Sequence, residues 1–408
     1  MNAASPSLQP VASAERITVI DSLRGFALLG ILLMNIEAFT GPMDLAFTGI
    51  DVHWQGIDRW ADALVYVLVQ GKFFPLFSLL FGAGFAVMAQ RADAAGRAFT
   101  PFYLRRSAAL LLIGLCHALL VWSGDILVLY ALASLVLLAC REAPQRWLPW
   151  MGMAVYLCGV ALTLLLGMMV SAMAVHAPDE LDKMAGSALA SIEQQRQAYG
   201  HGSWAEANVQ RLRDFGSTMG AVFVSGPEVL GMFLLGSWFA RSGALSAPAR
   251  FERLYARLRW IALPVGLLLA VAGAVWVPYI APGRFDAVGA AATGLNALAG
   301  VLLCLGYLGW FMRAREHLQW LAPAGRMALT NYLMQSVVCT LLFYGYGAGL
   351  FEWLPRAWQL EFAVVLFALQ LLLSHAWLRH FRFGPMEWLW RALTYLKWPP
   401  LRRAPSRG

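Results

Sequence analysis

The chain has 408 residues, of which 60% are hydrophobic and only 13% are charged. An average soluble domain is about half apolar and about a quarter charged. The composition therefore excludes an ordinary soluble enzyme, a nucleic-acid-binding protein and a disordered chain, and it predicts that a lipid bilayer surrounds the protein. The net charge of +8 fits the basic loops of a membrane protein, because the 31 lysines and arginines are spread between apolar runs.

Ten apolar stretches predict a bundle of helices, since crossing the hydrocarbon core of a bilayer takes about 20 mostly apolar residues. Backbone groups in lipid must be hydrogen-bonded within their own segment, so we predict that each stretch is an α-helix. The fold class is therefore all-α: a polytopic integral membrane bundle that forms one domain over residues 1–408. The predicted helices cover residues 18–40, 63–89, 104–122, 125–140, 147–175, 218–240, 258–280, 286–312, 327–350 and 357–379.

The orientation of the bundle follows from the lysines and arginines of its loops, which gather on the cytoplasmic side of a membrane. With the N-terminus inside, alternate loops carry most of these residues, so we predict that both termini are cytoplasmic in a bacterial inner membrane. The long segment 176–217 is then an outer loop with one or two surface helices, in which Leu181, Met184, Ala188 and Ile192 fall on one face; a flexible connector is the alternative. Residues 380–408 form a cytoplasmic amphipathic tail.

The first predicted helix carries a stripe of polar side chains through an apolar segment. Asp21 and Arg24 are three residues apart on one helical face and can form an ion pair. Asn35 lies about three turns further along the same face. The stripe fits either a structural ion pair with a packing asparagine, or a pocket near the inner face in which Arg24 binds an anionic head group.

Lys72 lies inside the second predicted helix, between Gly71 and Pro75. Glycine and proline within one membrane helix indicate a kink near a cavity. The position is too far from the outer end of the helix for the side chain to reach water easily. We therefore expect Lys72 to be paired or to face a cavity.

Two histidines are candidate general bases. His117 lies near the outer end of the third helix, and Asp125 follows a tight turn formed by Ser123 and Gly124. Antiparallel helices joined so closely place both side chains at a similar depth, where the carboxylate would orient the imidazole and raise its basicity. A buried histidine bonded to a helix carbonyl is the alternative. His53 stands in the first outer loop, where solvation alone would explain it.

Polar side chains also mark the C-terminal part of the chain. Asn331 and Gln335 share a face of the ninth helix, where hydrogen bonding between helices is the simplest interpretation. Glu387 and Arg391 form an i,i+4 pair on a tryptophan-rich amphipathic helix that suits the inner membrane interface. The histidines show no metal-ligand spacing, and the chain has no nucleotide-binding motif. We therefore expect no bound metal and no tightly bound cofactor.

These segments together resemble the YeiB-like family of bacterial membrane proteins (domain of unknown function 418). The resemblance covers nearly the whole chain, and its first and last motifs are hard to match by chance. The matching pieces are residues 21–30 with Asn35, 71–82, His117 with 124–127, 325–333 and 384–391.

The opening segment also resembles the start of a wider set of membrane acyltransferases, among them bacterial acyltransferase-three proteins and the lysosomal heparan glucosaminide N-acetyltransferase. This resemblance implies transfer of an acyl group from an inner-face donor, with acyl-CoA as the co-substrate. The acceptor would be a small molecule, a lipid or a glycan near the outer face. In the lysosomal enzyme a histidine follows the membrane helix that bears the Asp and Arg, shortly before a Trp and a Gly, and His53 is the residue that would match it here.

Three functions remain open. An acyltransferase would use His117 with Asp125, or His53, as its base. A transporter or exporter of an anionic or amphipathic metabolite would line a pathway with the same buried polar side chains. A non-catalytic partner would organise other membrane proteins. An inner-face cavity that ends near a histidine favours the enzyme, and a midplane pocket between similar halves favours the transporter. The residues assigned to the donor or substrate are Asp21, Arg24, Asn35, Lys72, Arg105, Arg106, Asn331 and Gln335.

Overall fold

The protein is a helical bundle in the computed structural model, which describes residues 18–403. Within these residues, eight helical segments are long and apolar enough to cross a membrane, and two shorter apolar helices accompany them. The predicted class, an all-α multi-pass membrane protein, is therefore confirmed. The N-terminal segment 1–16, predicted to be cytoplasmic, and the end of the tail, 404–408, lie outside the described residues.

Each predicted membrane helix corresponds to one or two helices of the structure. The apolar helices are α1 (Thr18–Thr40), α2 (Gly56–Leu68) with α3 (Phe73–Ala94), α4 (Phe99–Leu120), α5 (Leu127–Ala139), α6 (Leu148–His176), α8 (Trp204–Arg241), α10 (Leu263–Trp276), α11 (Ala287–Ala314), α13 (Ala328–Phe343) and α14 (Arg356–His380). The other helices are α7 (Pro178–Gln195), α9 (Glu252–Arg257), α12 (Ala322–Arg326) and α15 (Pro385–Tyr395). Short π- or 3₁₀-helical segments are η2 (Arg196–His201), η3 (Pro248–Phe251), η4 (Leu258–Ala262) and η5 (Gln319–Leu321).

The second predicted helix, 63–89, is divided in two. α2 ends at Leu68 and α3 begins at Phe73, and Gly71 between them has a φ of 80°. This left-handed conformation favours glycine, because a Cβ atom would clash with the neighbouring backbone. The break places Lys72 at the start of α3, buried in the bundle.

The helix predicted over 327–350 ends earlier, at Phe343. A glycine-rich segment follows it and turns back toward η2. An added Cβ atom at Gly345 would lie 2.7 Å from the Gly200 carbonyl oxygen, so the two backbones touch. Glycine therefore permits the close contact that replaces the last predicted turns of the helix.

The outer loop predicted over 176–217 is mostly helical. It contains α7, η2 and the first turns of α8, which begins at Trp204. A capping box starts α8: the Ser203 hydroxyl accepts from the Glu206 amide, and the Glu206 carboxylate accepts from the Ser203 amide. The spacing Ser-x-x-Glu is a sequence signal for such a start, so the beginning of α8 at Trp204, ahead of the predicted residue 218, was foreseeable.

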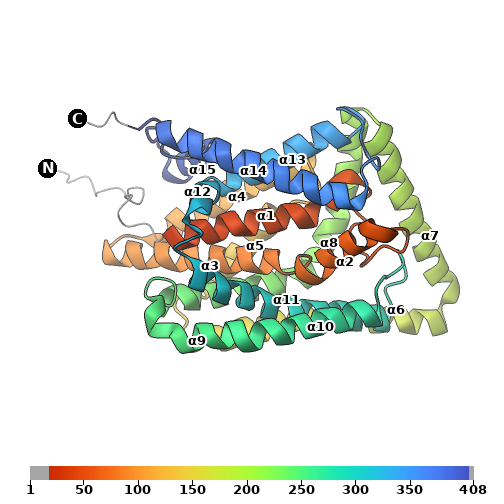
Figure 1. Ribbon diagram of the computed structural model, residues 1–408, viewed down its shortest axis with the longest axis horizontal. Helices are drawn as coiled ribbons and strands as arrows, with labels where there is room; N and C mark the ends of the chain where they lie inside the picture. The colour runs from red at the N-terminus through yellow and green to blue at the C-terminus, as the bar shows by residue number, and fades with distance from the viewer. Residues whose placement is uncertain (1–17, 404–408) are drawn as a thin grey trace.

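α7 and the first turns of α8 cross the end of the bundle opposite the two termini (Figure 1). Leu181 and Ile192 on α7 are buried and Ala188 is half-buried, as expected for one shared face, whereas Met184 is exposed and Ala185 is buried. The buried residues of α7 follow intervals of four, seven and three residues, because positions i, i+3, i+4 and i+7 of a helix share one face; they are Leu181, Ala185, Ile192 and Gln195.

α3 and α8 approach closely because each presents a glycine to the other. An added Cβ atom at Gly82 would lie 1.9 Å from the Phe233 carbonyl oxygen, and one at Gly236 would lie 1.8 Å from that of Leu79. Small residues permit such van der Waals contact between helices in lipid, where the hydrophobic effect supplies little attraction. Ser237 adds a hydrogen bond to the Gly82 carbonyl at 3.0 Å.

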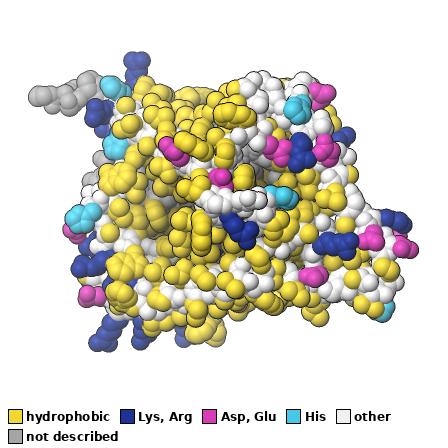
Figure 2. Space-filling view, turned by 45° about the vertical axis from the view of Figure 1, so that its right-hand side comes forward, with side chains coloured by type: hydrophobic (Ala, Val, Ile, Leu, Met, Phe, Trp, Pro, Cys, Tyr) yellow, Lys and Arg dark blue, Asp and Glu magenta, His cyan; other side chains and the backbone are white. Residues whose placement is uncertain are grey.

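The surface agrees with a membrane protein whose two ends differ. Hydrophobic side chains cover much of the face in Figure 2, and charged side chains gather toward its two ends. The end nearer the termini carries mostly lysine and arginine with a few acidic side chains, whereas the opposite end mixes basic and acidic side chains more evenly (Figure 2). This difference is the one expected if the termini face the cytoplasm.

Cysteine labelling tests this orientation. We expect a cysteine introduced at Ser187, which is exposed on α7, to react with a membrane-impermeant thiol reagent on intact cells. The matched control is Ser246→Cys, exposed in the turn after α8, which should react only after the membrane is permeabilised. Both changes are made in a chain whose exposed Cys116 and Cys158 are serine. Protection of position 187 on intact cells would contradict the orientation.

Candidate functional site

The end of α4 far from the termini carries a buried histidine–carboxylate pair. Following the predicted orientation, we call this end of the bundle the outer end and the end nearer the termini the inner end. The His117 Nδ1 atom lies 2.7 Å from Asp125 Oδ2, and the two side chains are 2% and 1% exposed. The other carboxylate oxygen of Asp125 accepts a hydrogen bond from the Val128 backbone amide at 2.8 Å. The contact predicted across the turn is therefore present, although the connection between α4 and α5, residues 121–126, is longer than the two residues expected.

The second imidazole nitrogen of His117 is the atom that can accept a proton. Among residues 18–403, Nε2 is buried and has no hydrogen-bond partner. When Nδ1 donates its proton to the Asp125 carboxylate, Nε2 is the basic atom of the neutral ring. The ring centroid lies 5.3 Å from that of Tyr332 on α13 and 6.4 Å from that of Trp122. Aromatic side chains therefore limit the contact of this nitrogen with water.

A polar layer from η2 and α8 covers the pair on its outer side. Asp214 on α8 is buried, and its carboxylate accepts a hydrogen bond from the Tyr199 hydroxyl at 2.5 Å. It also accepts one at 3.5 Å from the hydroxyl of Ser123, which lies in the turn after α4. Burial raises the pKa of Tyr199, so its hydroxyl stays protonated and donates. Arg211 is fully buried and donates to the Leu120 carbonyl, the last residue of α4, at 3.3 Å. We call these contacts the outer layer.

Arginines from α1, α4 and α15 gather at the inner end of the bundle. Arg106 on α4 lies within electrostatic range of Arg24 on α1 and Arg391 on α15. Arg24 forms the predicted ion pair with Asp21, with Nη1 3.3 Å from Oδ1, and its side chain stays partly exposed. Its Nη2 atom reaches α3, since an added Cβ atom at Gly84 would lie 3.0 Å from it. We call Arg24, Arg106 and Arg391 the inner arginine cluster. Guanidinium groups gathered in this way can bind a phosphate group.

Arg106 is positioned by α15. Its guanidinium carbon lies 3.5 Å from the centre of the Trp390 ring, and Trp390 Nε1 donates to the Arg106 carbonyl at 2.9 Å. The Nε atom of Arg106 is buried and, within the described part of the chain, has no hydrogen-bond partner. The neighbouring Arg105 is exposed and donates to the Thr394 carbonyl at 3.1 Å. The two arginines predicted to bind the donor therefore differ: Arg106 is held in the cluster, and Arg105 lies at the surface.

Glu387 joins α15 to the start of α13. One carboxylate oxygen accepts from the backbone amides of Leu329 at 2.7 Å and Thr330 at 3.1 Å, and the other from the Thr330 hydroxyl at 2.6 Å. A carboxylate at a helix N-terminus satisfies backbone amides that the helix leaves unpaired. Burial raises the pKa of Glu387, although these hydrogen bonds act in the opposite direction. Arg391, on the same helix, lies 4.5 Å over the Phe383 ring.

Lys72 is paired, as predicted, but not with the inner arginine cluster. It is fully buried, and its Nζ donates to the Tyr66 carbonyl at 2.8 Å and to Asn296 Oδ1 at 2.6 Å. Gly84, the α3 residue beside Arg24, is roughly 18 Å further along the helix at about 1.5 Å per residue. Lys72 therefore links the break between α2 and α3 to α11.

Asn331 and Gln335 form a polar ladder with α14. Asn331 Nδ2 donates to Ser374 Oγ at 3.0 Å, and Gln335 Nε2 donates to Gln370 Oε1 at 2.9 Å. Gln370 Nε2 donates in turn to the Asn331 carbonyl at 2.9 Å. Hydrogen bonding between helices accounts for these buried contacts.

The remaining predicted residues are His53, in the loop after α1, and Asn35 on α1. The His53 side chain is 82% exposed, with Nδ1 2.7 Å from Asp51 Oδ1 in the same loop. This solvated position differs from the buried position of His117. Asn35 is buried on α1, as expected for a residue on the polar face of that helix.

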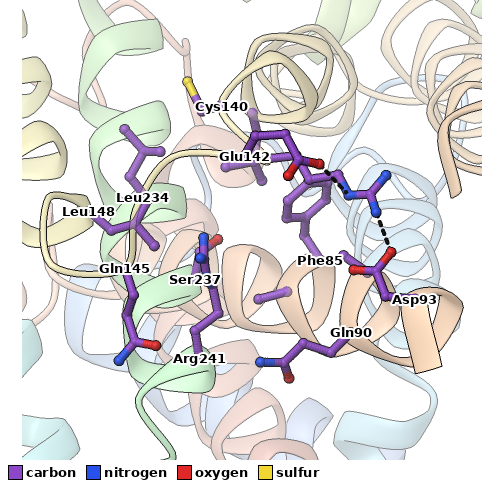
Figure 3. Close-up of a pocket in the computed structure, with 14 residues that line it drawn as sticks. Phe85, Gln90, Asp93, Cys140, Glu142, Gln145, Leu148, Leu234, Ser237 and Arg241 are labelled. Carbon is purple, nitrogen blue, oxygen red and sulfur yellow. Dashed lines mark hydrogen bonds and ion pairs between the residues drawn. The ribbon is translucent and has the colours of Figure 1, made fainter.

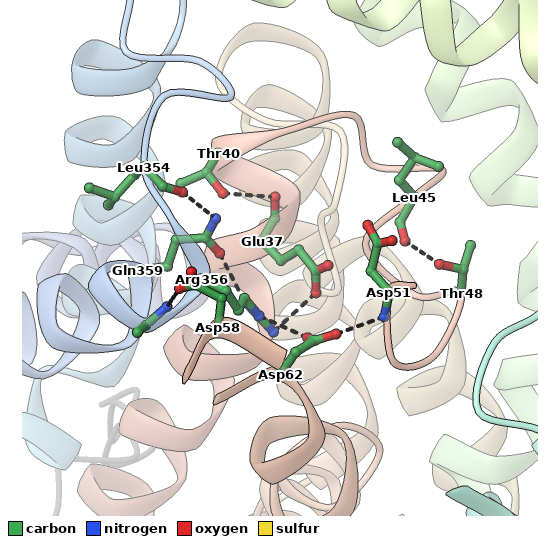
Figure 4. Close-up of polar contacts among 11 residues, drawn as sticks. Glu37, Thr40, Leu45, Thr48, Asp51, Asp58, Asp62, Leu354, Arg356 and Gln359 are labelled. Atoms are coloured by element: carbon green, nitrogen blue, oxygen red, sulfur yellow. Dashed lines mark hydrogen bonds and ion pairs between the residues drawn. The ribbon is translucent and has the colours of Figure 1, made fainter. Parts of the chain in front are cut away.

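A buried ion triad near the outer end was not anticipated from the sequence. Arg356, at the start of α14, places Nε 2.9 Å from Asp62 Oδ1 and Nη2 3.1 Å from Glu37 Oε2 (Figure 4). The carboxylates come from α1 and α2, so the triad joins three helices. A signal for it existed, because Glu37 is an ionisable residue inside the predicted helix 18–40. Its partners could not be named, since they lie far away in the sequence.

Glu228 is a second carboxylate that the same signal would have found. It lies inside the predicted helix 218–240, next to Pro227, and in the structure it is half-buried on α8. A Cβ atom added to Gly159 of α6 would lie 2.8 Å from the Cγ atom of Glu228. Glu228 therefore faces a neighbouring helix.

Fold and site define a multi-pass helical membrane protein with a buried histidine–carboxylate pair at one end and an arginine cluster at the other. Among residues 18–403, no group of three or more His, Cys, Asp or Glu side chains is placed to hold a metal ion. Within this class the chain can be assigned to a family.

Residues 239–397 match the family described as protein of unknown function (DUF418). The chain is 37% identical to uncharacterized protein YxaH of Bacillus subtilis (strain 168), over 97% of this chain and 98% of that protein. It is 34% identical to uncharacterized protein YeiB of Escherichia coli (strain K12), over 93% of this chain and 96% of that protein. The chain belongs to the DUF418 family of YeiB-like proteins. No solved structure matches it significantly.

Removing Arg356 tests the ion triad. Arg356→Gln should lower the free energy of unfolding by about 3–5 kcal/mol, because it leaves two buried carboxylates without their cation. The matched control is Arg196→Gln, whose ion pair with Glu352 lies at the outer surface and contributes little. Thermal unfolding of the purified proteins in one detergent measures both shifts. Equal shifts for the two variants would contradict a stabilising role of the triad.

Proposed function

We propose that the protein is a transmembrane acyltransferase of a bacterial inner membrane. It carries an acyl group from acyl-CoA, bound at the cytoplasmic side, to an acceptor at or near the outer face. One observation carries the proposal: Arg106 and His117 lie on one face of α4, roughly 16 Å apart at about 1.5 Å per residue. That separation is comparable to the length of the pantetheine arm that joins the phosphates of CoA to its thioester.

The inner arginine cluster holds the phosphates of the donor in this proposal. Guanidinium groups form paired hydrogen bonds with phosphate oxygens, and the Nε atom of Arg106 offers such a donor. With the phosphates beside Arg24, Arg106 and Arg391, the pantetheine arm follows α4 and brings the thioester to His117. Lys72 is engaged between helices, so we do not assign it to the donor.

His117 acts as the general base, and Asp125 orients its ring. Nε2 takes the proton of the acceptor's hydroxyl or amine while that oxygen or nitrogen attacks the thioester carbonyl. The carbon–sulfur bond then breaks, and the imidazolium returns the proton to the CoA thiolate. The products are the acylated acceptor and free CoA, and the histidine ends in its starting state. Asp125 stabilises the imidazolium between the two proton transfers.

The acceptor approaches from the outer side, where a small molecule, a lipid or a glycan is available. The outer layer covers this approach through Asp214 and Arg211, so it has to open before an acceptor reaches His117. The resemblance of the opening segment to membrane acyltransferases supports the same class of reaction. The two relatives are bacterial proteins, which supports a bacterial membrane, but their names do not identify an acceptor.

His117→Gln tests the base. The glutamine keeps hydrogen-bonding capacity but has no basic nitrogen, so kcat should fall about 10²- to 10⁴-fold while the protein remains folded. The measurement is transfer of label from acetyl-CoA to candidate acceptors by the purified protein. His53→Gln is the matched control and should keep full activity, because His53 is a solvated loop residue.

Two outcomes would contradict the proposal. Undiminished turnover by His117→Gln would remove His117 as the base. Failure of the native protein to transfer label from any acyl-CoA, together with movement of an anionic metabolite across vesicles containing it, would support the transporter instead.

Arg106→Gln tests the donor site. Losing a charged hydrogen bond to phosphate should raise the KM for acyl-CoA by about tenfold or more and change kcat little. Arg105→Gln is the matched control, since Arg105 is the exposed neighbour on the same helix. Steady-state kinetics at varied acyl-CoA concentration measure both. The donor site would be placed wrongly if the two variants had the same KM.

A further inference from the structure

An open pocket of about 310 Å³ lies at the inner end of the bundle, between α3, α5, α6 and α8 (Figure 3). Its size is at the lower end of small-molecule sites, which range over about 300–1,000 Å³. Apolar side chains such as Phe85, Leu137 and Leu234 form part of its wall, and the amides of Gln90 and Gln145 add hydrogen-bonding groups. None of these residues belongs to the proposed catalytic site.

The pocket has opposite charges on two sides. Arg141 is bonded to Asp93 and lies 3.4 Å from Glu142, so these three side chains together carry one net negative charge. Arg241 lies across the pocket from the two carboxylates (Figure 3). Its Nη1 donates to the Ala143 carbonyl at 2.9 Å. The four charges cancel, but the positive side and the negative side are separate.

The pocket lies at the depth of lipid head groups. α6, which lines it through Leu148, begins beside two exposed tryptophans, Trp147 at 53% and Trp150 at 72%. Exposed tryptophans mark the boundary between hydrocarbon and water in membrane proteins. A ligand here can therefore reach the pocket either from the cytoplasm or from the inner leaflet.

We propose that this pocket binds a zwitterionic group that joins a phosphate to a primary ammonium, as in an ethanolamine phospholipid head group. Arg241 binds the phosphate, and Asp93 and Glu142 accept hydrogen bonds from the ammonium. A pocket with no net charge and separated charges favours such a group over a simple anion or cation, because the potentials of ligand and site are then complementary. The proposal is independent of acyl transfer.

Lipid retention tests the proposal on the full-length protein. The purified protein is exchanged into micelles that contain equal amounts of phosphatidylethanolamine, phosphatidylcholine and phosphatidylglycerol, and native mass spectrometry counts the lipids that stay bound. We expect phosphatidylethanolamine to be retained on the order of tenfold over the other two. The trimethylated ammonium of phosphatidylcholine cannot donate hydrogen bonds, and phosphatidylglycerol has no cation.

Two variants separate the two sides of the pocket. Arg241→Gln should reduce retention of phosphatidylethanolamine, whereas Arg250→Gln, exposed at the same end of the bundle but outside the pocket, should not. Glu142→Gln should reduce the preference for phosphatidylethanolamine over phosphatidylcholine. Thermal unfolding of each variant shows that it is folded.

A soluble competitor distinguishes the two sources of the group. Displacement of the lipid by glycerophosphoethanolamine would support a free metabolite as the ligand, and failure of displacement alongside retained lipid would support the phospholipid. Equal retention of the three lipids by the native protein, with no binding of the soluble compound, would overturn the proposal. So would full retention of phosphatidylethanolamine by a folded Arg241→Gln protein.

Discussion

Hydrocarbon offers no hydrogen bonds, so polar side chains inside this bundle need partners from the chain itself. Arg356 finds two carboxylates, from α1 and α2. Lys72 finds a carbonyl and the Asn296 amide of α11. His117 finds the carboxylate of Asp125 across a turn. Each of these contacts ties helices together, and breaking one leaves a charge or a dipole in a medium that cannot solvate it.

Close backbone packing and polar pairing act together in this fold. Glycines such as Gly82 and Gly236 let α3 and α8 touch, but apolar contacts of this kind select a partner helix only weakly. Polar pairs are more selective, because a wrong neighbour leaves them unsatisfied. The ladder from Asn331 to Ser374 illustrates this for α13 and α14. The architecture therefore combines permissive close packing with specific polar contacts.

α4 connects the two polar regions from which we infer function. Its inner end places Arg106 among other arginines under α15, and its outer end places His117 under the outer layer. A straight helix fixes both the distance and the shared face of these residues, which a loop would not. The inner pocket is lined by α3, α5, α6 and α8 and contains none of the residues of the inner arginine cluster, so head-group binding and acyl transfer can be tested separately.

Sequence reasoning predicted most of the membrane helices, the Asp21–Arg24 pair and the His117–Asp125 contact. All of these depend on neighbours in the chain: apolar length, the three-residue spacing of one helical face, and a short connection between antiparallel helices. The contacts of Arg356 with Glu37 and Asp62, and of Lys72 with Asn296, became visible only in the folded bundle. In the sequence, residues such as Lys72 and Glu37 could be recognised as charged side chains within apolar segments. Their partners were not, because helix geometry fixes local spacing, whereas the neighbours of a helix depend on how the whole bundle packs.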